Sequence, residues 1–272
     1  MTRDAWLAKH PYLNPLSSLQ TLVEITAAEI SIPNASIPSW AEYAADFRAG
    51  VPVLWSACAA IDLDCLSSAV STLIEKLCSK PLPGELVAAS RTLHAELRRK
   101  PDSIRRAVAW LVEEDTFEPA CAGWFRYVSW TLLAQRLSSL VAAFSAWRND
   151  EEWLRNYCPV CGSPPAMAQL VGVDPGRIRF LSCGCCRARW RFRRTACPFC
   201  KQGDDHQLAV LAIEGENGLR IDCCKSCRGY IKTYDGSGNE DIMLTDWSSV
   251  HLDFVAGDLG LKRYARSLYE LA

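Results

Sequence analysis

Four pairs of cysteines, each with two residues between its members, constrain the fold of this 272-residue chain more than any other feature. A C-x-x-C spacing forms a tight turn, here called a knuckle, that presents two sulfurs to one ion, and two knuckles complete a tetrahedron of thiolates. The gap is 21 residues between the first two pairs and 23 between the last two, near the spacing of a two-knuckle ribbon. The sequence therefore predicts two four-cysteine metal sites, with the ligands Cys158, Cys161, Cys183, Cys186, Cys197, Cys200, Cys224 and Cys227.

An internal repeat indicates which pairs share an ion. The segment Y-C-P-V-C at 157–161 returns as A-C-P-F-C at 196–200. The second and fourth pairs are each followed by an arginine, Arg187 and Arg228, and each is preceded four residues earlier by another, Arg179 and Arg220. Two consecutive copies of one unit are typical of repeated modules. The repeat predicts that the first two pairs form one site and the last two form the other, while a crossed arrangement stays open.

The cysteine content favours metal over disulfides. Ten of the 14 cysteines lie between Cys158 and Cys227. The first residues lack a basic region followed by an apolar run, and no stretch reaches about 18 apolar residues, so we expect neither export nor membrane insertion. The expected location is the cytoplasm, where thiols stay reduced. Iron and zinc both accept four thiolates in a tetrahedron, and the residues do not choose between them.

The chain changes character near residue 157. Apolar residues recur at helical spacing in 41–47, 63–77, 84–97, 103–114 and 121–147, and again in 248–261. Short β-like runs at 177–181 and 208–213 lie among Gly, Pro and Cys clusters. We expect an α plus small metal-bound β architecture: an α-helical bundle at 1–156, a first rubredoxin-like or zinc-ribbon-like module at 157–196, and a second module with a C-terminal helix at 197–272.

Three further features could carry function. Cys185 and Cys223 are extra thiols beside ligand pairs, interpreted as bystanders, and His206 is interpreted as a loop histidine. A basic run is compatible with a protein partner, a nucleic-acid contact, or a strand face that is solvated or paired with acidic residues of the helical half, and we rank nucleic acid last. Net charge is −1, so the whole chain gives no electrostatic argument for nucleic acid. The run comprises Arg177, Arg179, Arg187, Arg189, Arg191, Arg193 and Arg194.

Taken together, these motifs resemble the formate dehydrogenase accessory protein family FdhE. The resemblance lies in C-P-V-C-G-S-x-P at 158–165, the second pair with Trp190, C-P-x-C at 197–200, and the fourth pair followed by G-Y-I-K-T at 229–233. H-P-Y-L at 10–13 and the segment 252–260 also resemble that family. The resemblance implies two rubredoxin-like domains that bind iron, one ion per four-cysteine site. It further implies a cytoplasmic factor that contacts the catalytic subunit of a respiratory formate dehydrogenase before export. The chain departs from the family's pattern in Cys185, Cys223 and a second knuckle that reads C-G-C-C.

The sequence therefore favours a maturation factor that is not an enzyme. It contains no recognisable catalytic triad, Gly-rich phosphate loop or carboxylate dyad, and two closed four-cysteine sites leave no open coordination position. The alternatives are a rubredoxin-like electron-transfer protein acting on a client enzyme and a zinc-ribbon nucleic-acid-binding protein. The oligomeric state stays open, a homo-oligomer included.

Overall fold

The computed structural model describes residues 2–32, 36–59, 62–99, 102–112, 116–147, 149, 151–173, 176–201, 207–216, 218–236 and 244–271. The chain forms two compact units, each assembled from separate stretches of sequence. One, here called the cysteine unit, comprises Met1–Asn14, Pro38–Cys58 and Val141–Ser267. The other, called the helical unit, comprises Pro15–Ile37, Ala59–Leu140 and Leu268–Ala272.

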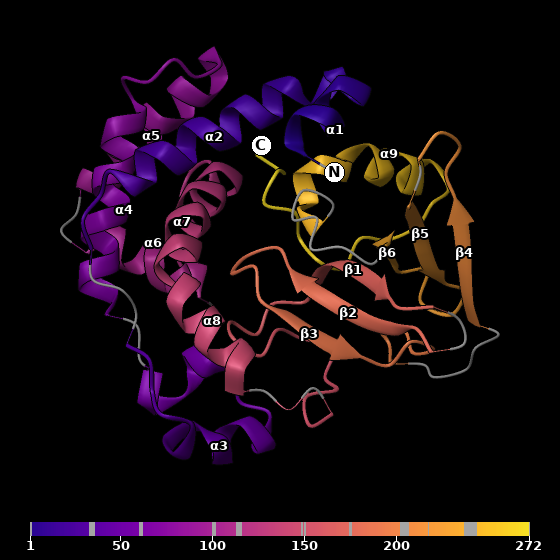
Figure 1. The fold of residues 1–272 in the computed structure, drawn as a ribbon. Coiled ribbons are helices and arrows are strands. Elements are labelled where there is room, and N and C mark those ends of the chain that lie inside the picture. The colour runs from indigo at the N-terminus through magenta and orange to yellow at the C-terminus, as the bar shows by residue number, and fades with distance from the viewer. Residues whose placement is uncertain are drawn as a thin grey trace. The chain divides into compact units, whose positions relative to one another are not determined.

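Apart from a helix at 14–28, the helices of the helical unit lie in segments whose apolar periodicity predicts helices. Its elements are α2 (Asn14–Ala28), α4 (Leu63–Leu77), α5 (Gly84–Arg99), α6 (Ser103–Leu111), α7 (Ala122–Arg136) and the start of α8 (Ser138–Trp147), labelled in Figure 1. The side chain of Asp62 accepts a 2.9 Å hydrogen bond from the Cys65 amide and so caps α4. Leu73, Leu93 and Leu132 are fully buried, so the apolar stripes of α4, α5 and α7 form the core.

The long apolar segment at 121–147 is two helices rather than the single helix that its periodicity predicts. Helix α7 ends at Arg136 and α8 begins at Ser138. The Ser138 hydroxyl donates a 2.8 Å hydrogen bond to the carbonyl of Gln135, an oxygen that a continuous helix would use for a backbone bond. Apolar spacing continues across the break, so periodicity alone gives no sign of it.

The cysteine unit combines short helices with a sheet. Its helical elements are α1 (Arg3–Lys9), η1 (Pro11–Leu13), α3 (Trp40–Ala49), η2 (Val53–Trp55), η3 (Ala57–Ala59), η6 (Asp246–Ser249) and α9 (Val250–Asp258). Helix α3 opens with a capping box in which Ser39 and Glu42 exchange side-chain and backbone hydrogen bonds. Its strands are β1 (Pro165–Val171), β2 (Ile178–Cys183), β3 (Arg189–Phe192), β4 (Leu208–Ala212), β5 (Leu219–Cys224) and β6 (Tyr230–Asp235).

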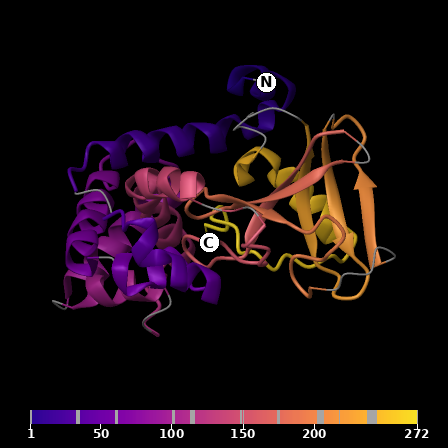
Figure 2. The same cartoon turned by 60° about the horizontal axis from the view of Figure 1, so that its bottom comes forward.

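Both copies of the repeat contribute three strands to one sheet, in the order β3-β2-β1-β6-β5-β4 (Figures 1 and 2). Neighbours within each copy are antiparallel, whereas β1 and β6 join the copies in parallel, with Met167 opposite Lys232. The prediction of helices together with a small β region is confirmed as helices with a six-stranded sheet. The repeat itself does not predict that the two modules share this sheet.

A buried ion pair spans the junction of the two modules. Arg179 of β2 is 2% exposed, and its Nη2 lies 3.1 Å from Oδ2 of Asp222 on β5. Arg220 places its Nε 2.9 Å from the other carboxylate oxygen of Asp222, and the Thr233 hydroxyl donates to Oδ2 at 2.9 Å. Two repeat-equivalent arginines thus pair with one carboxylate, which compensates the buried charge of Asp222.

A second buried network fixes α9 against β6. Nζ of Lys232 lies 2.7 Å from Asp246 and 2.8 Å from Asp253, and Nη2 of Arg263 lies 2.7 Å from Asp246. The Ser267 hydroxyl donates to Asp246 at 2.6 Å. Burial alone would raise the pKa of Asp246, but its two cationic partners hold that pKa well below the usual range.

Candidate metal centres

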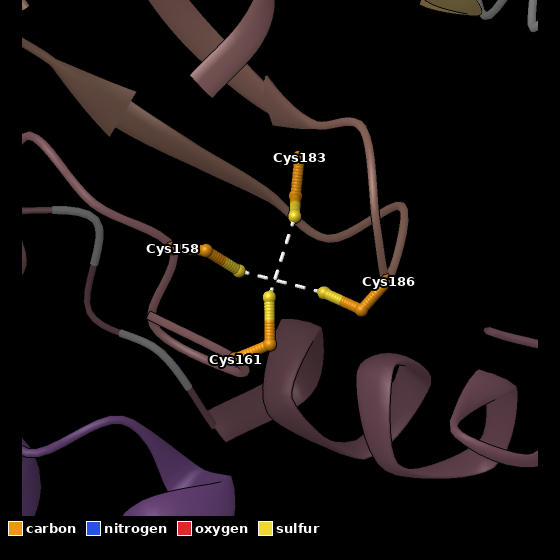
Figure 3. A group of neighbouring side chains, drawn as sticks. All are labelled: Cys158, Cys161, Cys183 and Cys186. Carbon is orange, nitrogen blue, oxygen red and sulfur yellow. Dashed lines mark hydrogen bonds between the residues drawn. The ribbon is translucent and has the colours of Figure 1, made fainter. Parts of the chain in front are cut away.

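The first candidate centre brings together the four cysteines of the first two pairs. Figure 3 shows their side chains converging on a common point. Cys158 and Cys161 precede β1, whereas Cys183 ends β2 and Cys186 lies in the following turn. The sulfurs of Cys158 and Cys186 are 3.4 Å apart, as are those of Cys161 and Cys183, and all four sulfurs lie within 4.8 Å of one another.

The second candidate centre repeats this arrangement with the last two pairs. Cys197 and Cys200 precede β4, Cys224 ends β5, and Cys227 lies in the turn before β6. The Cys197 and Cys227 sulfurs are 3.7 Å apart, and so are those of Cys200 and Cys224. The structure groups the eight predicted ligands as the repeat predicts and not in the crossed arrangement.

The knuckles share one backbone conformation. The residue after the second cysteine of each pair has a positive φ: 80° at Gly162, 65° at Arg187, 62° at Lys201 and 57° at Arg228. This turn points amides at sulfur, as where the Val160 amide donates to Cys158 at 3.4 Å. Such donors stabilise thiolate charge, and so the knuckle prepares its sulfurs for a cation.

Residues 38–58 support the first knuckle. The amides of Val53 and Leu54 donate to the carbonyls of Pro159 and Val160, each at 2.9 Å. The Tyr43 hydroxyl also reaches the Pro159 carbonyl at 3.3 Å. Because these hydrogen bonds come from residues 38–58, a segment outside the predicted first module, the geometry of the first knuckle does not depend on that module alone.

The geometry and donor set of both centres fit a tetrahedral thiolate metal. Metal–sulfur bonds of about 2.3 Å place the sulfurs of a tetrahedron about 3.8 Å apart, and the four sulfur–sulfur separations given above lie within about 0.4 Å of that value. Burial raises the pKa of the Cys158 and Cys186 thiols, and hydrogen bonds led by Cys158 lower the pKa of Cys183. Buried thiols in this arrangement release their protons when a cation compensates the charge.

The two centres differ in exposure. Every sulfur-bearing residue of the first centre is buried, whereas Cys200 and Cys227 of the second are half-buried. In the second centre, burial tends to raise the pKa of Cys224, but amide donors at Cys227 and Ser226, followed by sulfur contacts, lower it to about 7. The second centre is therefore the more accessible to solvent, chelators and partners.

The remaining candidates from the sequence lie outside the two groups. Cys185 sits beside the first centre, where the Ser163 hydroxyl donates to its sulfur at 3.6 Å. Cys223 lies within β5, paired with Ala209 of β4. Neither belongs to a four-cysteine group among the described residues. His206 lies outside the residues that the structure describes.

Much of the basic run serves the fold. Arg179 is buried against Asp222, as described above. Arg177 lies 2.5 Å from Asp235, Arg191 lies 3.2 Å from Glu151, and Arg189 donates to the side chain of Gln169. The other three members, Arg187, Arg193 and Arg194, are exposed. The run thus pairs largely with acidic and amide groups, but Asp222 and Asp235 belong to the second module, and Glu151 is the acidic partner named here that lies in the predicted helical half.

Sequence reasoning missed one cluster, formed by His10, Glu216 and His251. Their ligand atoms lie within 4.8 Å of one another. The three residues are spread over most of the chain, with no local spacing to reveal them. His10 falls within the H-P-Y-L motif, which was the only available signal.

The chain is similar to known proteins over both its sequence and its fold. The family model described as "FdhE, central domain" matches residues 157–194, the segment that carries the first centre. A "Protein FdhE homolog" of Aquifex aeolicus is 34% identical over 122 residues, which cover 43% of this chain and 42% of that protein. A "Protein FdhE homolog" of Pseudomonas aeruginosa is 32% identical over 124 residues, covering 42% of this chain and 39% of that protein. The matches thus span about two fifths of these curated relatives.

The crystal structure of the FdhE protein from Pseudomonas aeruginosa has the same fold. It superposes with a TM-score of 0.63 at 20% sequence identity and covers 98% of this chain and 96% of that one. The resemblance to the FdhE family is therefore confirmed by sequence, and the fold by structure. Among the described residues, no helix is long and apolar enough to cross a membrane.

Proposed function

We propose that this chain, a relative of the FdhE proteins, is a maturation factor for a respiratory formate dehydrogenase and carries out no catalysis of its own. It binds the catalytic subunit in the cytoplasm, before export of that subunit. The similarity to proteins named FdhE homologs carries the proposal, because it spans the segment that holds the first four-cysteine centre. Fold similarity alone would not assign a function.

In this proposal the eight paired cysteines hold two mononuclear metal ions in rubredoxin-like modules, which follow an N-terminal helical bundle along the chain. The modules run over residues 157–196 and 197–272, and the bundle over 1–156. We assign iron, with zinc as the alternative. Four thiolates saturate a tetrahedral ion, so neither centre offers substrate a coordination position. The bound ions would fix the knuckles relative to one another, and the modules so held would present a surface for a client.

A binding experiment tests the client. Tagged chain should co-purify with the formate dehydrogenase catalytic subunit that still carries its export signal, and not with the precursor of an unrelated exported enzyme. Cys158→Ser and Cys197→Ser should weaken that complex, with Cys185→Ser as the matched thiol control. A strain lacking the gene should lose formate oxidation. Full activity in that strain, together with no complex in vitro, would sink the proposal.

Electron transfer to the client is the second candidate, and the exposure of the second centre favours it. Cys200 and Cys227 are half-buried, so an ion there would be near solvent and near a docked partner. Rubredoxin-type iron supplies one-electron chemistry, whereas zinc has none. Metal analysis and the visible spectrum of anaerobically purified protein separate the two functions, because a colourless protein with zinc alone excludes electron transfer.

A further inference from the structure

Three side chains from distant segments of the cysteine unit converge away from the eight paired cysteines. His10 follows α1, Glu216 lies in the β4–β5 connection, and His251 is in the first turn of α9. Oε1 of Glu216 lies 2.8 Å from Nε2 of His10 and 2.7 Å from Nε2 of His251. The side chains are only 9%, 8% and 19% exposed, in the order His10, Glu216, His251. One carboxylate oxygen therefore faces two imidazole nitrogens in a largely buried place.

A neutral His10 ring has only one N–H, which is too few to donate to both the Trp6 carbonyl and the Glu216 carboxylate. Nδ1 of His10 lies 3.1 Å from the carbonyl oxygen of Trp6, which only accepts, so Nδ1 carries the proton. Nε2 of a neutral ring then presents a lone pair to the carboxylate of Glu216. Two lone pairs at 2.8 Å repel, so a cation or an additional proton belongs between them.

His251 and the second carboxylate oxygen leave further coordinating capacity. Nε2 of His251 lies 2.7 Å from Oε1 of Glu216, and within the described part of the chain its Nδ1 has no hydrogen-bond partner. Oε2 of Glu216 is also buried without a partner there. Unpaired buried polar atoms are costly, and these belong to side chains whose ligand atoms lie within 4.8 Å of one another.

Protonation of both the His10 and the His251 ring is electrostatically unfavourable. The His10 and His251 rings stack with centroids 5.4 Å apart and planes 25° apart, so two imidazolium charges would repel face to face.

We propose that His10, Glu216 and His251 bind one divalent transition-metal ion of the zinc type, through the two Nε2 atoms and a carboxylate oxygen. Two histidines and one carboxylate are a set that holds zinc or non-haem iron with a coordination position left open. Hydrogen bonding of His10 Nδ1 to a backbone carbonyl is the outer contact that metal-bound histidines commonly make. Ligand bonds of about 2.1 Å place neighbouring ligand atoms of a tetrahedron about 3.4 Å apart, so the separations of 2.8 Å and 2.7 Å would need to open by about 0.6–0.7 Å when the ion binds.

Such an ion would tie α1, the β4–β5 connection and α9 to one another. It would be a third site, made of nitrogen and oxygen ligands, and so chemically distinct from both thiolate centres. The proposal does not rest on the maturation role, because it concerns only residues of this chain and a cation.

The test uses full-length protein whose thiolate centres are already loaded with zinc. Zn²⁺ is added under equilibrium dialysis, and bound zinc is counted per chain by mass spectrometry. We expect one ion beyond those of the two thiolate centres. Glu216→Gln and His251→Gln should weaken its binding by more than about tenfold, while His94→Gln, at a half-buried histidine of α5, should leave it unchanged. Retention of the thiolate-bound ions in each variant reports that the cysteine unit is folded.

Cobalt gives a second readout. The added equivalent of Co²⁺ should produce weak ligand-field bands without sulfur-to-metal charge transfer, unlike cobalt placed in a thiolate centre. Saturation of wild-type protein at the thiolate centres alone would overturn the proposal, because the cluster would then be held by protons. A further ion that persists in both ligand variants would overturn it as well.

Discussion

Substitution of Gly162 by alanine tests how the first centre is held. Gly162 follows Cys161 with φ +80°, and a Cβ added there would lie 2.5 Å from Cζ2 of Trp55. The three equivalent knuckle positions carry arginine or lysine at positive φ, so this backbone conformation tolerates a side chain. The difference at Gly162 is therefore the indole that occupies the space.

The expected destabilisation has two parts. Left-handed backbone costs a non-glycine residue about 1–2 kcal/mol, and displacing the ring or the knuckle adds about 1–3 kcal/mol, as overpacking does. Gly215→Ala is the matched control, since Gly215 has φ +82° and nothing within 4 Å of an added Cβ. We expect the Gly162→Ala change to exceed the control by the overpacking part alone.

Urea unfolding of the metal-loaded protein, followed by tryptophan fluorescence, measures both changes. A double-mutant cycle with Trp55→Ala isolates the clash, because Trp55 is 57% exposed and its truncation should cost little by itself. The double variant should recover about 1 kcal/mol or more of the Gly162→Ala loss. The reasoning is refuted when Gly162→Ala costs no more than Gly215→Ala, or when removing the indole recovers nothing.

Three further changes test the centres and the buried network. Cys158→Ser should remove one metal ion per chain and Cys185→Ser should remove none, as metal analysis will report; loss of metal from the second variant would make Cys185 a ligand. A chromophoric chelator should strip the second centre before the first, because Cys200 and Cys227 are half-buried; equal rates in single-centre variants would contradict this. Asp246→Ala should cost about 1–3 kcal/mol in urea unfolding, since it leaves the buried cations of Lys232 and Arg263 with Asp253 as their remaining carboxylate partner. Folding lowers the pKa of Asp246, so the ionised carboxylate stabilises the folded protein at pH values above its unfolded-state pKa of about 3.9, and this stabilisation is lost as the pH falls below that value. An unchanged midpoint of acid unfolding in Asp246→Asn would contradict this.

The sequence predicts the grouping of the paired cysteines because the relevant information is local. A knuckle is defined by two residues between its sulfurs, and a repeat of the whole unit indicates its partner knuckle. Helix 63–77 was likewise predictable and matches α4, because an amphipathic stripe specifies which face is buried. The break at Leu137 was not, because apolar spacing continues across it and the Ser138–Gln135 hydrogen bond that accompanies it leaves no mark on the periodicity.

Only the tertiary structure decided how the two modules join. Parallel pairing of β1 with β6 and the reach of Arg179 to Asp222 are contacts between residues far apart in the chain. The support of the first knuckle by residues 38–58, and the convergence of His10 and His251 on Glu216, are of the same kind. Residue type and spacing determined the chemistry of each thiolate centre, since four thiolates bind a cation wherever the chain brings them together. Packing between distant segments determined what surrounds those centres, because such contacts depend on burial and shape, which local sequence patterns do not encode.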